Sequence, residues 1–83
     1  MPITYAGSAH KHQVPHDSIW YVLMTVESVP HETDWGEAGL WYVGPDNRGI
    51  TLEIGTVRRG RNEMVYHAMP LSDRHNHEPK ETK

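Results

Sequence analysis

The first clear hydrophobic pattern of the chain lies between residues 17 and 30 and is helical. Apolar residues recur there at the i, i+3, i+4, i+7 spacing of one buried helix face. Pro15 suits the first turn, Asp17 places negative charge near the positive end of the helix dipole, and Pro30 ends the pattern. The spacing predicts an amphipathic helix whose buried stripe consists of Ile19, Val22, Leu23 and Val26.

A second pattern, after residue 39, alternates and predicts three strands joined by two turns. The strands fall near residues 40–43, 50–57 and 63–69. Pro, Asp, Asn and Gly at residues 44–49 indicate a turn wider than two residues, and Gly60 marks the second turn. Ile-Thr-Tyr at residues 3–5 predicts a further short strand at a sheet edge.

The alternation also assigns side chains to the two faces of the predicted sheet. The residues of the central strand that face the helix are Ile50, Leu52 and Ile54. Thr51, Glu53 and Gly55 face outward. The side of His67 depends on the second turn. An odd number of turn residues places His67 opposite Glu53 on the outer face, and an even number turns it inward.

These elements predict one α+β domain of residues 1–71, in which one main amphipathic helix packs on a three- to four-stranded antiparallel meander. A chain of 83 residues buries only about 60 % of the surface that its unfolded form exposes, so it builds a single core. Residues 72–83 contain no hydrophobic side chain and predict a disordered polar tail.

The amino-acid composition indicates in which cellular compartment the protein is expected. The chain has no Cys, which excludes disulfides, thiolate catalysis and zinc–thiolate sites and favours a reducing environment. It contains neither an apolar run of about 18 residues nor a signal-peptide pattern after Met1. We therefore expect a cytoplasmic protein without a membrane partner.

Seven His residues raise the question of a metal. His10, His12 and His16 lie close in sequence, and His75 and His77 lie in the tail, but no matched second pair completes a structural zinc site. We expect solvated histidines, with neither a metal nor a cofactor.

The net charge of −3 opposes general nucleic-acid binding, because duplex affinity depends on Lys and Arg that neutralise phosphates. Arg58, Arg59 and Arg61 nevertheless fall within four positions of one predicted hairpin turn. They predict a local phosphate-binding patch, to which Lys11 and His12 add auxiliary charge. RNA is the expected ligand of this patch.

His67 and Glu53 form a candidate acid–base pair beside these arginines. Cleavage of RNA through the 2′-OH needs two positioned proton-transfer groups and a cation for the phosphate charge, and no metal. We predict His67 as the acid–base group, Glu53 as its partner and Arg58 as the phosphate-stabilising residue. The alternative without catalysis is a solvated hairpin tip with a hydrogen-bonded strand histidine.

Four short sequence strings stand in a recognisable order along the chain: Lys11-His12-Gln13-Val14, Leu40-Trp41-Tyr42-Val43-Gly44, Arg48-Gly49 and Val65-Tyr66-His67-Ala68. In this order they resemble the BrnT-type toxins of bacterial toxin–antitoxin pairs, which belong to the RelE/ParE-like superfamily. The resemblance covers roughly residues 10–71. The chain has Met69 and Pro70 where the family has adjacent arginines followed by a C-terminal helix.

The resemblance implies the architecture of a RelE-like small ribonuclease toxin. It further implies a cytoplasmic endoribonuclease that inhibits growth, and a cognate antitoxin protein of the ribbon-helix-helix type that binds and neutralises it.

The alternative function is a non-enzymatic protein-interaction module, such as a phage or mobile-element protein that binds a host protein. Trp20 and Met24 lie together on one flank of the helix stripe, and Trp35 lies in an acidic connector, where it is expected to fold back over the sheet end. Trp20 and Met24 either extend the core beneath a neighbouring loop, which we favour, or form a partner-binding ridge. In the interaction module, all three side chains contact the partner.

Overall fold

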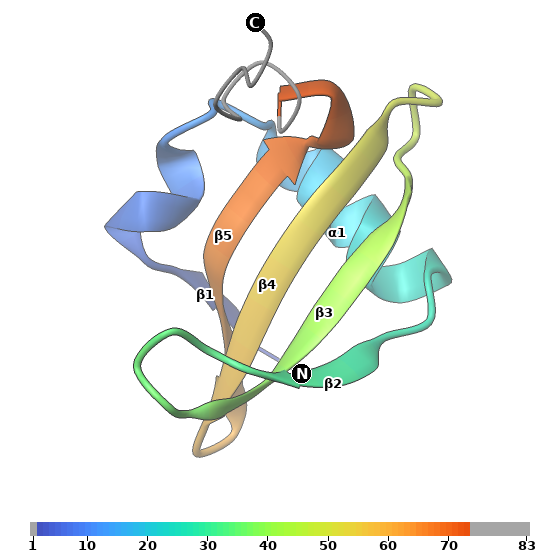
Figure 1. The fold of residues 1–83 in the computed structure, drawn as a ribbon. Coiled ribbons are helices and arrows are strands. Elements are labelled where there is room, and N and C mark those ends of the chain that lie inside the picture. Colours follow the sequence, from blue (N-terminus) through green and yellow to red (C-terminus); the bar gives the residue numbers. More distant parts are fainter. Residues whose placement is uncertain (1, 74–83) are drawn as a thin grey trace, which may run out of the picture.

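Five strands and two helices make up the regular structure of residues 2–73, which the computed structural model describes (Figure 1). The strands are β1 (Ile3–Tyr5), β2 (Val29–Glu32), β3 (Ala38–Pro45), β4 (Thr51–Arg59) and β5 (Asn62–Pro70). The helices are the short 3₁₀ helix η1 (Gly7–His10) and the α-helix α1 (His16–Thr25). Residues 71–73 form a helical turn, and residues 74–83, which hold most of the predicted tail, lie outside the described residues.

The strands form one mixed sheet in the order β1-β5-β4-β3-β2. Strands β2 to β5 are an antiparallel meander, and β1 pairs with β5 in parallel at one edge. The α+β class and the short edge strand were predicted correctly. The predicted three or four antiparallel strands were wrong, because β2 was missed and β1 runs parallel. Strand β2 contains Pro30, which an edge strand tolerates because one side of its backbone needs no partner.

Helix α1 starts as predicted and ends earlier. The carbonyl oxygen of Pro15 accepts hydrogen bonds from two backbone N–H groups of the first turn, each 3.1 Å long. The helix ends at Thr25, five residues before Pro30, because Val26 adopts an extended backbone and packs on β3. A Cβ at Gly44 would lie 2.5 Å from a methyl group of Val26, so only glycine leaves room for this contact. No helix of residues 2–73 is long and apolar enough to cross a membrane.

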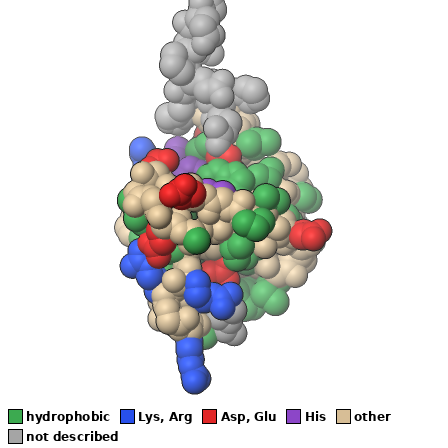
Figure 2. Space-filling model, turned by 60° about the horizontal axis from the view of Figure 1, so that its bottom comes forward, with side chains coloured by type: hydrophobic (Ala, Val, Ile, Leu, Met, Phe, Trp, Pro, Cys, Tyr) green, Lys and Arg blue, Asp and Glu red, His purple; other side chains and the backbone are tan. Residues whose placement is uncertain are grey.

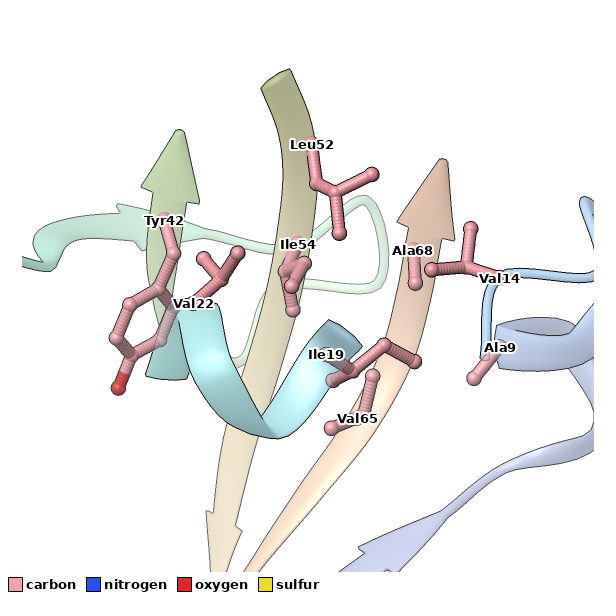
Figure 3. Close-up of a cluster of buried hydrophobic side chains, with 9 residues drawn as sticks. All are labelled: Ala9, Val14, Ile19, Val22, Tyr42, Leu52, Ile54, Val65 and Ala68. Atoms are coloured by element: carbon pink, nitrogen blue, oxygen red, sulfur yellow. The ribbon is translucent and has the colours of Figure 1, made fainter. Parts of the chain in front are cut away.

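The hydrophobic core lies between α1 and the face of the sheet that α1 covers (Figures 1 and 3). Ile19 and Val22 of α1 are completely buried, as are Leu52 and Ile54 of β4, which confirms these members of the predicted stripe and strand face. The other two stripe residues, Leu23 and Val26, are half-buried, and Val26 lies outside α1. Ile50 precedes β4 and is 39 % exposed, so its predicted place in the core was wrong. The core cluster comprises Ala9, Val14, Ile19, Val22, Tyr42, Leu52, Ile54, Val65 and Ala68.

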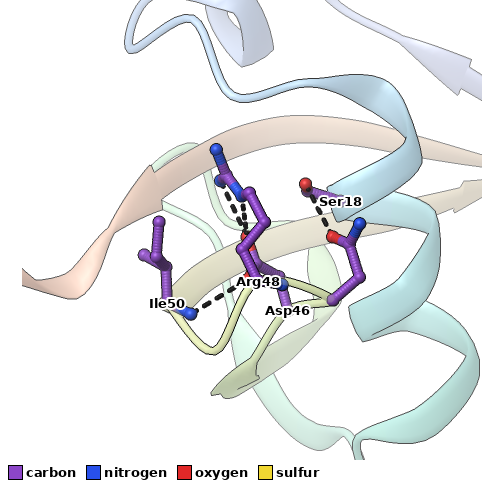
Figure 4. Close-up of polar contacts among 5 residues, drawn as sticks. Ser18, Asp46, Arg48 and Ile50 are labelled. Atoms are coloured by element: carbon purple, nitrogen blue, oxygen red, sulfur yellow. Dashed lines mark hydrogen bonds and ion pairs between the residues drawn. The ribbon is translucent and has the colours of Figure 1, made fainter.

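The β3–β4 connection is organised around Asp46, whose side chain is fully buried (Figure 4). Its Oδ1 accepts hydrogen bonds from the backbone N–H groups of Arg48 and Ile50, at 2.7 and 2.9 Å. Its Oδ2 accepts two hydrogen bonds from the Arg48 guanidinium. The hydroxyl of Ser18 donates to Oδ1 of Asn47 at 2.9 Å, which joins α1 to this loop.

Candidate functional site

A β-bulge in β5 decides which side chains reach the outer face of the sheet, opposite α1. The β4–β5 turn holds two residues between paired positions, and this even number alone predicts that His67 points toward α1. The register shifts at Gly55/Thr56, however, so Tyr66 is an extra residue and His67 pairs with Gly55. His67 therefore lies on the outer face with Glu53.

Glu53 and His67 form a contact on this face. Nε2 of His67 lies 3.3 Å from Oε1 of Glu53, and the Glu53 residue is only 3 % exposed. The Trp41 ring stacks on the imidazole, with centroids 5.4 Å apart and planes inclined by 9°. When Nε2–H donates to the carboxylate, the lone pair of a neutral ring lies on Nδ1, which can accept a proton. The pair has the composition of a general base and its orienting group.

A second hydrogen-bonded pair of titratable side chains lies beside the first. The hydroxyl of Tyr66 lies 2.8 Å from Nε2 of His31, which comes from β2. The His31 ring lies 4.7 Å from that of Trp41, and Trp35 meets Tyr66 edge-on at 4.9 Å. Burial raises the pKa of Tyr66, and the nearby carboxylates add to the rise, so the phenol keeps its proton.

Gly55 lies beneath the aromatic rings of the site. A Cβ at this position would lie 2.7 Å from Cζ3 of Trp41 and 2.7 Å from Cζ of Tyr66, closer than real Cβ contacts allow. The glycine therefore leaves room for both rings at this position. Above them is a hollow of about 240 Å³, which we call the outer-face hollow. Its lining residues are His31, Glu32, Asp34, Trp41, Tyr66 and His67.

The segment before α1 reaches the same face. The ring of His12 lies edge-on to that of His67, with centroids 6.4 Å apart, and Nδ1 of His12 lies 3.5 Å from Oδ2 of Asp73. Lys11 is exposed to solvent. His12, which was predicted with Lys11 as auxiliary charge for the arginine patch, therefore lies beside His67.

The arginines of the predicted phosphate-binding patch do not lie beside His67. Arg58 points to the side of the sheet that carries α1, because alternate strand residues point to opposite faces. It also lies three residues along β4 from Gly55, which pairs with His67, and three strand residues span roughly 10 Å. Arg59 forms two hydrogen bonds with Glu37, at 3.0 and 2.8 Å, and Arg61 lies in the β4–β5 turn. The placement of Arg58 beside the acid–base pair was wrong. Figure 2 brings this end of the molecule forward and shows basic side chains there with acidic ones nearby.

The electrostatics of the outer-face hollow follow from its lining. Glu32 and Asp34 contribute carboxylates, and neither Lys nor Arg is among the lining residues. Among the lining residues, which all belong to residues 2–73, the imidazoles are the groups that can carry positive charge when protonated. This arrangement disfavours tight binding of a phosphate group and leaves aromatic rings and imidazoles as the contact surface for a ligand.

The predicted partner-binding residues do not form one surface. Trp20 is 47 % exposed and Met24 is 61 % exposed, so the favoured prediction that they extend the core was wrong. They line a hollow with Leu23 of α1 and with Ile3. Trp35 folds back over the sheet as predicted, but its contact is with Tyr66 on the opposite face.

Sequence reasoning missed His31 and Trp41 as members of the site. His31 of β2 pairs with Gly39 of β3. Trp41 of β3 pairs with Gly55 of β4, which also pairs with His67, so Trp41 lies on the same face as His67. Glycine as the cross-strand partner of an aromatic residue was the available signal, since it leaves space for the ring.

Comparison of the chain with protein-family models, with curated proteins and with solved structures returned no match. The resemblance to BrnT-type toxins therefore stays an expectation. The outer-face hollow and the hydrogen-bonded side chains around it are therefore the basis for a proposal of function.

Proposed function

We propose that the outer-face hollow is the active site of a small endoribonuclease that cleaves RNA through its 2′-OH. The observation that carries this proposal is the presence of two proton-transfer pairs around one hollow. Glu53 and His67 form one pair, and His31 and Tyr66 form the other. Trp41 contacts both imidazoles, so it lies between the two pairs.

In the proposed reaction, His67 takes the proton from the 2′-OH while Glu53 orients the imidazole. The 2′-oxygen forms a bond to the adjacent phosphorus, and the bond between phosphorus and the 5′-oxygen breaks. His31, hydrogen-bonded to Tyr66, gives a proton to the leaving 5′-oxygen. The products are a 2′,3′-cyclic phosphate and a free 5′-hydroxyl, and the protein gains and loses one proton.

Aromatic rings supply the binding contribution that the charges of the site lack. Trp35 is exposed and contacts Tyr66, which lines the hollow, and stacking of a nucleobase on such a ring contributes about 1–3 kcal/mol. A stacked base has to be unpaired, which favours single-stranded RNA as substrate.

The phosphate is the group that the site stabilises least. Glu32 and Asp34 repel it, and the imidazolium form of His31 is the proposed source of positive charge near the leaving oxygen. Because few phosphates are neutralised, RNA affinity should depend only weakly on salt concentration.

A cleavage assay tests the proposal. End-labelled single-stranded RNA is incubated with the protein in EDTA, next to the same RNA carrying 2′-O-methyl groups throughout. The unmodified RNA should be cut to products ending in a 2′,3′-cyclic phosphate, and the methylated RNA should stay intact. His67→Ala and His31→Ala should each lower the rate by about 10²–10⁴-fold.

Arg58→Ala is the matched control. Arg58 lies on the other face of the sheet, so its substitution should leave the cleavage rate unchanged. Cleavage that survives in both histidine variants would indicate a contaminating nuclease. The absence of any cleavage by the wild-type protein would refute the proposal.

The resemblance to BrnT-type toxins supports a cellular role, and we propose that the chain is the toxin of a toxin–antitoxin pair. Induced expression in a bacterial host should stop growth, and the His67→Ala variant should not. Coexpression of the neighbouring gene, with a ribbon-helix-helix protein as the expected product, should restore growth. Equal growth arrest by the wild type and His67→Ala would contradict the enzymatic role.

The second candidate is the non-enzymatic interaction module, and the exposure of Trp20 and Met24 favours it. In that case Trp20→Ser/Met24→Ser should abolish the effect on growth, whereas His67→Ala should retain it. These two variants therefore separate the two functions in one growth assay.

A further inference from the structure

A pair of imidazoles lies near the β1 edge of the sheet and shares no residue with the outer-face hollow. His10 ends η1 and His16 begins α1, and their Nε2 atoms lie 2.9 Å apart. The ring centroids are 5.0 Å apart, and both residues are exposed. The sequence grouped His12 with these two, but the structure brings His12 to Asp73 instead.

The two nitrogens can converge on a third atom. At this distance, one neutral ring donates its Nε2–H to the other, which accepts. A neutral imidazole can instead carry its proton on Nδ1, and when both rings do so, two lone pairs are left on neighbouring Nε2 atoms. Such a pair of lone pairs is a bidentate ligand for a divalent cation.

The surrounding structure holds both rings in place. Tyr5 stacks on His16 with centroids 3.8 Å apart and planes inclined by 1°. Helix η1 is fixed by the fully buried Ala9 and by a hydrogen bond from the Ser8 hydroxyl to the carbonyl oxygen of Tyr66. Little conformational entropy is therefore lost when the imidazoles bind a common ligand.

The distance between the two Nε2 atoms favours some metal ions over others. Metal–imidazole bonds are about 2.0–2.1 Å long, so two nitrogens at adjacent corners of a square lie about 2.8–3.0 Å apart, and at corners of a tetrahedron about 3.3–3.4 Å apart. The separation of 2.9 Å fits two neighbouring positions at 90°, as in the square or tetragonal sites that Cu²⁺ and Ni²⁺ prefer, better than two corners of a tetrahedron. Cu²⁺ binds more tightly than Ni²⁺ to a given set of nitrogen ligands.

We propose that His10 and His16 form a two-histidine binding site for Cu²⁺, with water molecules in the remaining positions. No group of three or more metal-ligating side chains occurs among residues 2–73, so within this part of the chain the two imidazoles are the ligands of the site. Bound copper links η1 to α1, and the tighter it binds, the more it stabilises the fold.

Calorimetric titration of the full chain tests the proposal. The reference protein carries His75→Gln/His77→Gln, which removes the other closely spaced His pair from the competition for copper. In a buffer that does not coordinate metals, the reference should bind a single Cu²⁺, with weaker binding of Ni²⁺ and of Zn²⁺.

Two variants and one control locate the site. His10→Gln and His16→Gln should each weaken Cu²⁺ binding by about tenfold or more, because each leaves one ligand in place of a chelating pair. His12→Gln is the matched control and should bind as the reference does. Far-UV circular dichroism checks that each variant is folded.

Electron paramagnetic resonance gives an independent result. The Cu²⁺ spectrum of the reference should show two equatorial nitrogen ligands, and that of either single variant should show one. The proposal is overturned if the reference binds no Cu²⁺, if the His10 and His16 variants bind it as tightly as the reference, or if His12→Gln weakens binding equally.

Discussion

Replacement of Asp46 by alanine should strongly destabilise the protein. The carboxylate is completely buried and accepts four hydrogen bonds within the β3–β4 connection (Figure 4). Two of them come from backbone N–H groups, those of Arg48 and Ile50, which lose their acceptor in the variant. Hydrogen bonds to a charged group contribute about 1.5–3 kcal/mol each, and water can replace part of this in a loop.

The expected loss in the free energy of unfolding is therefore about 2–3 kcal/mol for Asp46→Ala. The pair with Arg48 adds little, because that side chain is 42 % exposed and exposed ion pairs contribute about 0–1 kcal/mol. Asp46→Asn keeps an oxygen that can accept the two backbone N–H groups, so it should lose only about 1 kcal/mol. For a domain of this size, the alanine variant should unfold about 10–20 °C lower.

The effect should also depend on pH. Burial raises the pKa of Asp46, but the hydrogen bonds from Arg48 and from the backbone N–H groups of Ile50 and Arg48 outweigh it, so the pKa falls below its ordinary value. A carboxylate whose pKa is lower in the folded state stabilises the protein above its unfolded pKa, and this contribution is lost as pH falls through the folded pKa. The difference between wild type and Asp46→Ala should therefore shrink below about pH 4.

Urea denaturation followed by circular dichroism, at neutral pH and at a series of acidic pH values, measures these differences. A loss below about 0.5 kcal/mol for the alanine variant would refute the assigned role of the carboxylate. Equal losses for the alanine and asparagine variants would show that the backbone hydrogen bonds are not the source of the stability.

Three further substitutions or titrations probe the core and the site. Ile19→Ala removes a completely buried side chain and should cost about 2–5 kcal/mol in urea denaturation. Gly55→Ala should displace Trp41 and Tyr66, which would appear as an altered near-UV circular dichroism spectrum and a slower cleavage of RNA. Burial and a hydrogen bond to a carboxylate raise the pKa of Tyr42 to about 12, so its phenolate absorbance should appear at the alkaline end of a titration. The raised pKa stabilises the fold below about pH 10, and this stability should be lost as the pH rises toward 12.

The elements with a strong hydrophobic period could be predicted from the sequence. The stripe of α1 and the alternation in β4 each have one face buried against the other element, so burial imposes the pattern directly. Strand β2 could not be predicted this way, because its residues are exposed or half-buried and it contains Pro30. His31, which this strand carries into the site, was missed for the same reason.

The arginine cluster shows why adjacency in sequence is a poor guide to a site on a sheet. Arg58 and Arg59 are neighbours in the chain, but successive strand residues point to opposite faces. Arg59 meets Glu37 next to Trp35 on the outer face, whereas Arg58 lines a hollow on the α1 side. A charged patch predicted from a run of residues therefore has to be divided between two faces before it is assigned to any site.

The position of His67 depends on a contact far away in sequence, which no local pattern reveals. The extra residue in β5, Tyr66, leaves its carbonyl oxygen without a regular place in the ladder with β4. The hydroxyl of Ser8 donates to that oxygen, and the N–H of Ala6 donates to the neighbouring carbonyl of Val65 at 2.9 Å. The N-terminal segment thus satisfies the backbone at the bulge, and the bulge reverses the face that turn length alone would give His67. The two hydrogen-bonded pairs of the outer face share this one origin, because Tyr66 belongs to one pair and His67 to the other.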